Sequence, residues 1–127
     1  MKSTIIAVYG TLKEGRGNHK HYLSNSKQIS KNAKTTNKFA LYSSGIPFVT
    51  KDQDKTQVNV EVYEVDDETL NKVDRLEGHP NWYRRELTPI TITKDDGEEE
   101  KLDAWLYFMH LSDKQKQQLK FHEDGNY

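Results

Sequence analysis

The chain contains no cysteine, which excludes a disulfide framework, a thiolate zinc site and a cysteine nucleophile. It also lacks any apolar run of the roughly 18 residues needed to span a bilayer, and residues 1–4 lead into a predicted strand without the apolar core of a signal peptide. Charge of one sign is missing too, because 19 basic and 20 acidic residues leave a net charge of -1. No global field therefore attracts nucleic acid or an anionic membrane. We expect a cytoplasmic protein that binds neither.

The chain instead has a small apolar fraction that is rich in aromatic residues. Of its 127 residues, 33% are hydrophobic and 31% are charged, and the aromatic residues are four Phe, two Trp and seven Tyr. This length supports one hydrophobic core, so we predict a single domain over residues 1–127, as a monomer or weak dimer. The aromatic side chains are expected to supply much of that core or to line a pocket.

Strand patterns dominate the order of predicted elements. Alternating or continuously apolar runs predict strands at residues 5–8, 28–33, 39–42, 46–49, 58–65, 83–93 and 102–109. The second of these lies in a polar segment, residues 24–38, that is typical of a surface connection and holds at most an edge strand. Pro47 places the strand around it at an edge or a bend. Helical turns are expected at residues 19–23 and 112–120. Six or so strands around one good helix predict an α+β fold with a curled sheet or barrel.

The first predicted strand ends just before Gly10, where small and polar residues take over. A buried strand that breaks into a glycine-containing turn exposes backbone N–H groups at one end of a sheet. Convergent N–H groups can hold a carboxylate or an oxyanion. An ordinary strand followed by a loop explains the same pattern, and the spacing alone does not separate the two interpretations.

The predicted helix at residues 67–77 follows a capping aspartate and stops at a glycine. Leu70 and Val73 mark its apolar face, and Glu77 projects almost between the two columns that they define. The apolar stripe of this helix therefore ends in a carboxylate.

Two interpretations of Glu77 are open. In one, it sits in a fraying last turn and reaches water or pairs with Arg84 or Arg85. In the other, it is partly buried, and both desolvation and the helix C-terminus raise its pKa. A carboxylate of that kind can take and return a proton near neutral pH, as general acid–base catalysis requires.

Three stretches resemble the γ-glutamylcyclotransferase-like family. The opening motif of that family is similar to Val8-Tyr9-Gly10-Thr11-Leu12-Lys13, followed by Gly17-Asn18-His19. Its helix-ending motif, with a glutamate and then a Tyr-x-Arg pair, is similar to Val73-Asp74-Arg75-Leu76-Glu77-Gly78 followed by Trp82-Tyr83-Arg84-Arg85. Here Val73 stands where leucine is usual. The closing Gly125-Asn126-Tyr127 is similar to a terminal Gly-acid-aromatic pattern of the family.

The resemblance implies a small mixed β-barrel of about six strands with a few peripheral helices. It also implies an enzyme that cyclises a γ-glutamyl group to 5-oxoproline and releases the attached amine. The substrate's own α-amine attacks its γ-carbonyl, so no cofactor, metal or enzyme nucleophile is needed. His19 and His21 lie two residues apart in a polar loop without a third partner, which does not predict a metal site.

The resemblance assigns roles to particular residues. Glu77 is the expected general acid and base. The expected substrate-binding residues, acting chiefly through backbone donors of one loop, are Tyr9, Gly10, Thr11, Leu12 and, in the same cavity, Tyr83. Tyr83 is equally well explained as a core aromatic residue. Arg85 is expected to have a structural role, paired with a carboxylate.

The leaving amine is less well defined. The Tyr-Gly-Thr-Leu-Lys form of the first motif and the short chain resemble the γ-glutamylamine cyclotransferase branch, which acts on γ-glutamyl-ε-lysine. One alternative is a non-catalytic module that keeps the anion-binding pocket without turnover; the retained Glu77 argues against it. A second alternative is a cyclotransferase that removes a γ-glutamyl protecting group in a biosynthetic pathway. Such an enzyme would differ only on the leaving-group side of the pocket.

Overall fold

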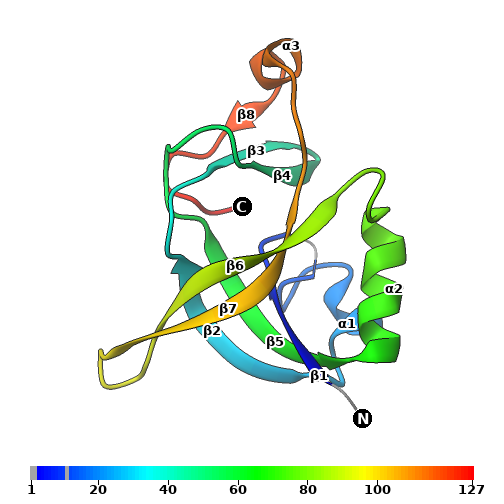
Figure 1. Cartoon of the computed structure of the whole chain (residues 1–127), viewed down its shortest axis with the longest axis vertical. Helices are drawn as coiled ribbons and strands as arrows, with labels where there is room; N and C mark the ends of the chain where they lie inside the picture. The colour runs from blue at the N-terminus through cyan, green and yellow to red at the C-terminus, as the bar shows by residue number, and fades with distance from the viewer. Residues whose placement is uncertain (1–2, 11) are drawn as a thin grey trace.

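A computed structural model describes residues 3–10 and 12–127, and its main element is a closed barrel of five strands (Figure 1). In spatial order the barrel strands are β1 (Ser3–Val8), β5 (Asn59–Asp66), β2 (Lys27–Thr35), β6 (Arg84–Thr93) and β7 (Glu99–Phe108). The barrel closes at β1, which pairs antiparallel with β5 and parallel with β7. The expected mixed barrel is therefore confirmed.

The expected count of about six barrel strands is slightly wrong, because two of the predicted strands belong to a second sheet. This small sheet has the order β4 (Ile46–Thr50), β3 (Ala40–Ser44) and β8 (Lys120–Phe121). Its third strand takes the free edge of β3, at a place where the sequence predicts the end of a helix. Pro47 lies in the edge strand β4, as predicted, since proline cannot donate to a ladder.

The segment predicted as a surface connection contains a full barrel strand. β2 lies between β5 and β6, so it is not an edge strand. Its pairing with β5 shifts register between Gln28 and Ser30 and again between Ser30 and Ala33. These irregularities break the alternation of buried and exposed residues that would reveal the strand in the sequence.

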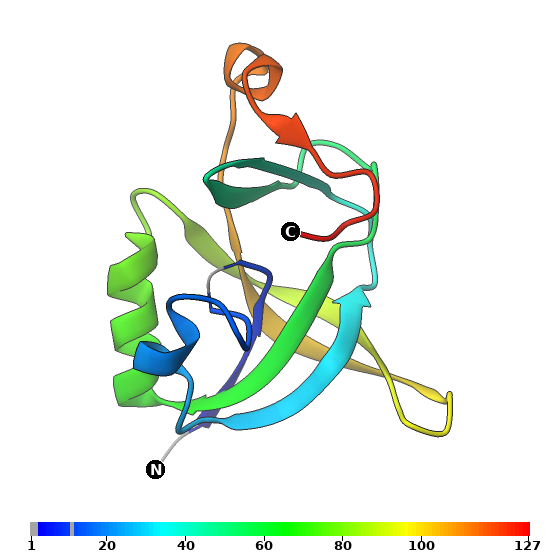
Figure 2. The same cartoon turned by 180° about the vertical axis from the view of Figure 1, so that it is seen from behind.

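The helices lie outside the barrel (Figures 1 and 2). α2 (Asp67–Glu77) begins and ends as predicted: the Asp66 carboxylate accepts the Thr69 N–H at 2.7 Å, and Gly78 adopts the left-handed conformation with φ 68°. α1 (His19–Tyr22) packs beside it. α3 (Asp113–Gln117) ends before residue 120, because β8 begins there. None of the helices described is long and apolar enough to cross a membrane.

β1 and the end of β7 are buried on both faces. Ala7 and Leu106 face the barrel interior, whereas Ile6, Val8 and Tyr107 join a second cluster with the inner face of α2. Burial on both faces explains why β1 is continuously apolar in sequence. Residues at these two strand ends therefore lie between the barrel core and the helix.

We predict that Leu106→Ala lowers the free energy of unfolding by about 2–4 kcal/mol, because its side chain is fully buried in the barrel and truncation leaves a cavity. Leu87→Ala on the neighbouring strand is the matched control; its side chain is 55% exposed, so we expect a loss below about 0.5 kcal/mol. Urea unfolding of the two variants measures both values. Equal losses would contradict the placement of the core.

Candidate active site

A cavity of about 290 Å³ opens where the ends of β1 and β7, the last turn of α2 and the β3–β4 hairpin meet. All five of the predicted site residues that the structure describes line this cavity: Tyr9, Gly10, Leu12, Glu77 and Tyr83. Thr11, also predicted, lies outside the described residues. The two sequence motifs are therefore brought to one place by the fold.

Gly10 permits a close approach between the loop after β1 and the β3–β4 hairpin. A Cβ atom at this position would lie 2.6 Å from Cγ of Pro47, well inside van der Waals contact. Both residues line the cavity. Any larger residue at Gly10 would push the hairpin away from the strand end and widen the site.

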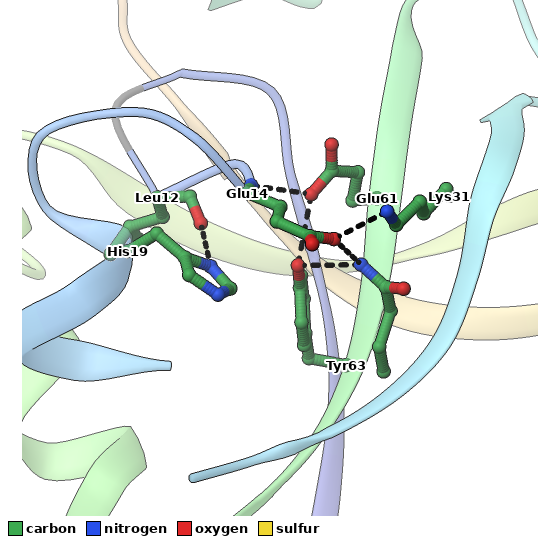
Figure 3. Close-up of polar contacts among 7 residues, drawn as sticks. Leu12, Glu14, His19, Lys31, Glu61 and Tyr63 are labelled. Carbon is green, nitrogen blue, oxygen red and sulfur yellow. Dashed lines mark hydrogen bonds and ion pairs between the residues drawn. The ribbon is translucent and has the colours of Figure 1, made fainter. Parts of the chain in front are cut away.

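The loop after β1 is fixed by a polar network on its outer side (Figure 3). Glu61 on β5 accepts the backbone N–H of Glu14 at 2.8 Å and the hydroxyl of Tyr63 at 2.9 Å. The Glu14 carboxylate in turn pairs with Lys31 on β2 at 2.7 Å. These contacts tie the loop to two barrel strands.

His19 fixes the same loop from its far end. Its Nδ1 atom lies 3.0 Å from the carbonyl oxygen of Leu12, and its ring packs against Tyr63 at 5.6 Å between centroids (Figure 3). His19 is thus a loop anchor. Within the described residues no group of three or more His, Cys, Asp or Glu side chains is placed to hold a metal ion.

The chain end covers the loop from another side. The backbone oxygen of Tyr127 accepts a hydrogen bond from Arg16 at 2.6 Å and from the Lys13 ammonium group at 3.3 Å. The Tyr127 hydroxyl donates to the carbonyl of Gly45, in the turn of the β3–β4 hairpin, at 2.8 Å. One residue therefore joins the loop and the hairpin, which form two walls of the cavity.

Glu77 is the last residue of α2 and is partly buried in the cavity wall. Its carboxylate makes no hydrogen bond or ion pair to any of the described residues. Burial raises its pKa from the ordinary 4.5 to about 7. A group with this pKa is present in both protonation states near neutral pH.

The tyrosines around Glu77 direct their hydroxyl protons elsewhere. Tyr9 donates to the backbone carbonyl of Tyr107 at 2.7 Å, and Tyr83 donates to the carbonyl of Pro47 at 2.7 Å. Burial also raises the pKa of both phenols, so they stay neutral. Because their protons are already bound, these hydroxyls do not offset the desolvation of Glu77.

The Tyr107 hydroxyl donates a hydrogen bond to the carboxylate of Asp74 at 2.5 Å. Asp74 lies one helical turn before Glu77. The same Asp74 oxygen accepts the Arg85 Nε–H at 2.9 Å, and the Arg85 guanidinium lies 4.6 Å from the centre of the Trp105 ring. Arg85 therefore pairs with a carboxylate, as expected. This pair and Tyr107 hold the end of α2 against β6 and β7.

Eight residues that line the cavity were not among the predicted site residues: Ala7, Val8, Asn18, Ile46, Pro47, Leu76, Trp82 and Tyr107. Tyr107 alternates with Leu106 and Phe108 and so is placed on the solvent face of a half-buried strand. The signal against that placement is the continuous apolar run from residue 106 to 109, which is typical of a strand buried on both faces.

Comparison with known proteins agrees with this arrangement. The family model described as γ-glutamyl cyclotransferase, AIG2-like, matches residues 6–127. A protein of Methanocaldococcus jannaschii, named provisionally as a γ-glutamylcyclotransferase, is 47% identical over 103 residues, which are 81% of this chain and 82% of that protein. The γ-glutamylaminecyclotransferase of Mus musculus is 31% identical over 114 residues, 84% of this chain and 76% of that protein.

A solved structure shares the fold. The crystal structure of an AIG2-like protein from Mus musculus has a TM-score of 0.78 at 27% sequence identity, and the match covers 98% of this chain and 88% of that one. The mixed barrel, the pocket that gathers both motifs and these matches agree with one another. The chain belongs to the γ-glutamyl cyclotransferase, AIG2-like family, and is a cyclotransferase enzyme of that family.

Proposed function

We propose that this enzyme cyclises the γ-glutamyl group of γ-glutamylamines, such as γ-glutamyl-ε-lysine, or of γ-glutamyl amino acids. The products are 5-oxoproline and the free amine, and Glu77 is the general acid and base. The observation that carries the proposal is a partly buried carboxylate with a pKa of about 7 and no hydrogen-bond partner among the described residues, in the wall of a cavity. The mouse relative named as a γ-glutamylaminecyclotransferase supports the amine branch.

The proton balance of this reaction needs one group that acts twice. The Glu77 carboxylate takes a proton from the substrate α-ammonium, and the freed amine attacks the γ-carbonyl carbon. This forms the C–N bond of a five-membered ring and a tetrahedral intermediate. Glu77 then returns the proton to the departing nitrogen as its bond to the γ-carbon breaks, and the ring nitrogen loses its second proton to the released amine, which leaves as the ammonium ion. The attack is intramolecular, so the main task of the cavity is to hold the substrate folded.

Substrate binding is proposed to use the loop that follows β1. Tyr9, Gly10 and Leu12 of this loop line the cavity. We propose that backbone N–H groups of these residues and of Thr11 hold the α-carboxylate and the γ-carbonyl. The Tyr83 hydroxyl donates its hydrogen bond to the Pro47 carbonyl, so the Tyr83 oxygen can still accept one. We assign that oxygen to the substrate α-ammonium.

We predict that Glu77→Gln folds and loses activity by about 10²-fold or more, because the amide cannot exchange the proton. Release of 5-oxoproline from γ-glutamyl-ε-lysine, γ-glutamyl-alanine, glutathione and a γ-glutamyl alkylamide measures this. The control is Glu68→Gln, an exposed carboxylate on the same helix, which should keep full activity. Normal turnover by Glu77→Gln would refute the assignment of Glu77. Inactivity of the folded wild-type protein on all four compounds would instead favour the binding module.

The pKa of Glu77 also predicts the pH dependence of the rate. The base form of Glu77 starts the reaction, so kcat/KM should fall as pH drops below about 7, by tenfold per pH unit. The measurement is kcat/KM between pH 5 and pH 9. An acid limb near the ordinary glutamate pKa of 4.5 would show that Glu77 is solvated in the working enzyme.

The same pKa predicts how stability depends on pH. The folded protein binds the Glu77 proton more tightly than the unfolded chain does, so this site favours folding fully below pH 4.5 and loses its contribution as pH rises through 7. Relative to Glu77→Gln, the wild type should therefore lose up to about 3 kcal/mol of unfolding free energy between pH 4 and pH 8. Urea unfolding of both proteins at the two pH values tests this. A pH-independent difference would contradict it.

A further inference from the structure

We propose, on the basis of the function proposed above, that among the γ-glutamylamines and γ-glutamyl amino acids named there this enzyme prefers a γ-glutamylamine whose leaving amine carries a long, uncharged apolar substituent, which lies in a second hollow beyond Trp82. In the described part of the chain three large apolar side chains are exposed: Ile46 at 36%, Trp82 at 54% and Leu87 at 55%. Ile46 and Trp82 both line the cavity that holds Glu77. Exposed apolar side chains that line a pocket indicate a ligand that covers them.

The exposed fractions of the lining side chains distinguish the inner end of the cavity from its rim, and this sets how a substrate would be oriented. Tyr9, Tyr83 and Tyr107 are nearly inaccessible and form the deep end of the cavity, whereas Ile46 and Trp82 form its rim. The glutamyl group must reach the deep end, where the loop backbone and Glu77 lie. The amine that is released therefore points out between Ile46 and Trp82.

The second hollow shares a wall with the first. It has a volume of about 320 Å³ and lies between the small sheet and the segment that carries α3. Phe48, in its wall, stacks on Tyr83 of the first cavity with 5.8 Å between ring centroids and 12° between planes. The edge of Trp82 packs on Tyr83 at 5.1 Å, and Trp82 lines both spaces. A substituent that passes over Trp82 leaves one cavity and enters the other.

The lining of the second hollow selects for apolar groups. Its apolar side chains are Phe48, Trp82, Met109, Leu111 and Leu119, and its polar ones are Ser44, Gln115 and Gln118. No charged side chain is among the described residues that line it. A carboxylate or ammonium group placed there would lose its hydration without gaining a counter-charge. An alkyl or aryl chain would instead replace water against these five apolar side chains.

A third hollow also borders Trp82, and it is the competing route. It is lined in part by Lys51, Arg84 and His110 and would suit a leaving group with a carboxylate, such as an amino acid. However, its lysine is already paired with Glu86 in the same lining. The apolar rim at Ile46 and Trp82 favours the uncharged route.

The test is a series of γ-glutamyl amides with methyl, butyl and octyl substituents, compared with γ-glutamyl-alanine and γ-glutamyl-ε-lysine. Burying one methylene stabilises a complex by about 0.8 kcal/mol at most, so kcat/KM should rise by about two- to fourfold per methylene once the chain passes Trp82. The octylamide should exceed both charged compounds by at least about tenfold in kcat/KM.

Two variants in the second hollow locate the effect. Gln118→Glu, at an exposed position, brings a carboxylate to the edge of the hollow, and Leu119→Ala removes part of its apolar wall. Each should lower the ratio of kcat/KM for octylamide to methylamide by about fivefold or more. Leu87→Glu changes the third exposed apolar residue, which lines neither space, and should leave the ratio unchanged. Unchanged ratios in both hollow variants would overturn the proposal.

The outcomes separate this inference from the proposed function. Turnover of the methylamide with a flat alkyl series would overturn the inference alone, because the methylamide needs only the first cavity. A preference for γ-glutamyl-alanine that Arg84→Gln abolishes would also overturn it and would assign the leaving group to the third hollow. No turnover of any compound would overturn the proposed function and this inference together.

Discussion

The hydrogen bonds that Asp74 accepts from Tyr107 and Arg85 determine where α2 ends relative to the barrel, and the position of Glu77 depends on them. The left-handed Gly78 and the hydrogen bond from the Tyr83 N–H to the Glu77 carbonyl, at 3.1 Å, fix the last helical turn from its other end. With them, a carboxylate one turn further along is held in a cavity wall. The acid that pairs with Arg85 is thus structural, whereas Glu77 has no hydrogen-bond or ion-pair partner among the described residues.

The arrangement of its neighbours leaves Glu77 without a hydrogen-bond partner in the part of the chain that the structure describes. The hydroxyls of Tyr9 and Tyr83 donate hydrogen bonds to backbone carbonyls, and the hydroxyl of Tyr107 donates one to Asp74. A single hydroxyl turned toward Glu77 would stabilise its charged form and lower its pKa. The ionised form of Glu77 is therefore unfavourable in this fold, and as a result the group titrates near neutral pH.

Local signals were sufficient to predict much of this fold and of the candidate site. The cap at Asp66, the glycine after Glu77 and the apolar run of β1 each depend on neighbouring residues, and all were found where the sequence indicated them. The resemblance of two motifs to the family then predicted that Glu77 and the loop after β1 share one site, and both line the same cavity.

The parts that could not be predicted depend on distant contacts. β8 is a two-residue strand that exists because it pairs with β3, far away in sequence. β2 is masked by its register shifts against β5. The place of Tyr107 in the cavity depends on α2 covering a strand face that alternation assigns to solvent.

The contacts of Tyr127 have a consequence for how the cavity opens. They join the loop at Lys13 and Arg16 to the hairpin turn at Gly45 across 82 to 114 residues of chain. They are partly exposed to water, whereas the barrel ladders are buried. Detachment of this last segment would remove the link between two cavity walls while every barrel strand stayed paired, and the loop would keep its contacts with Glu61 and Lys31. Such a local opening at the site costs less free energy than global unfolding, because it leaves the barrel paired.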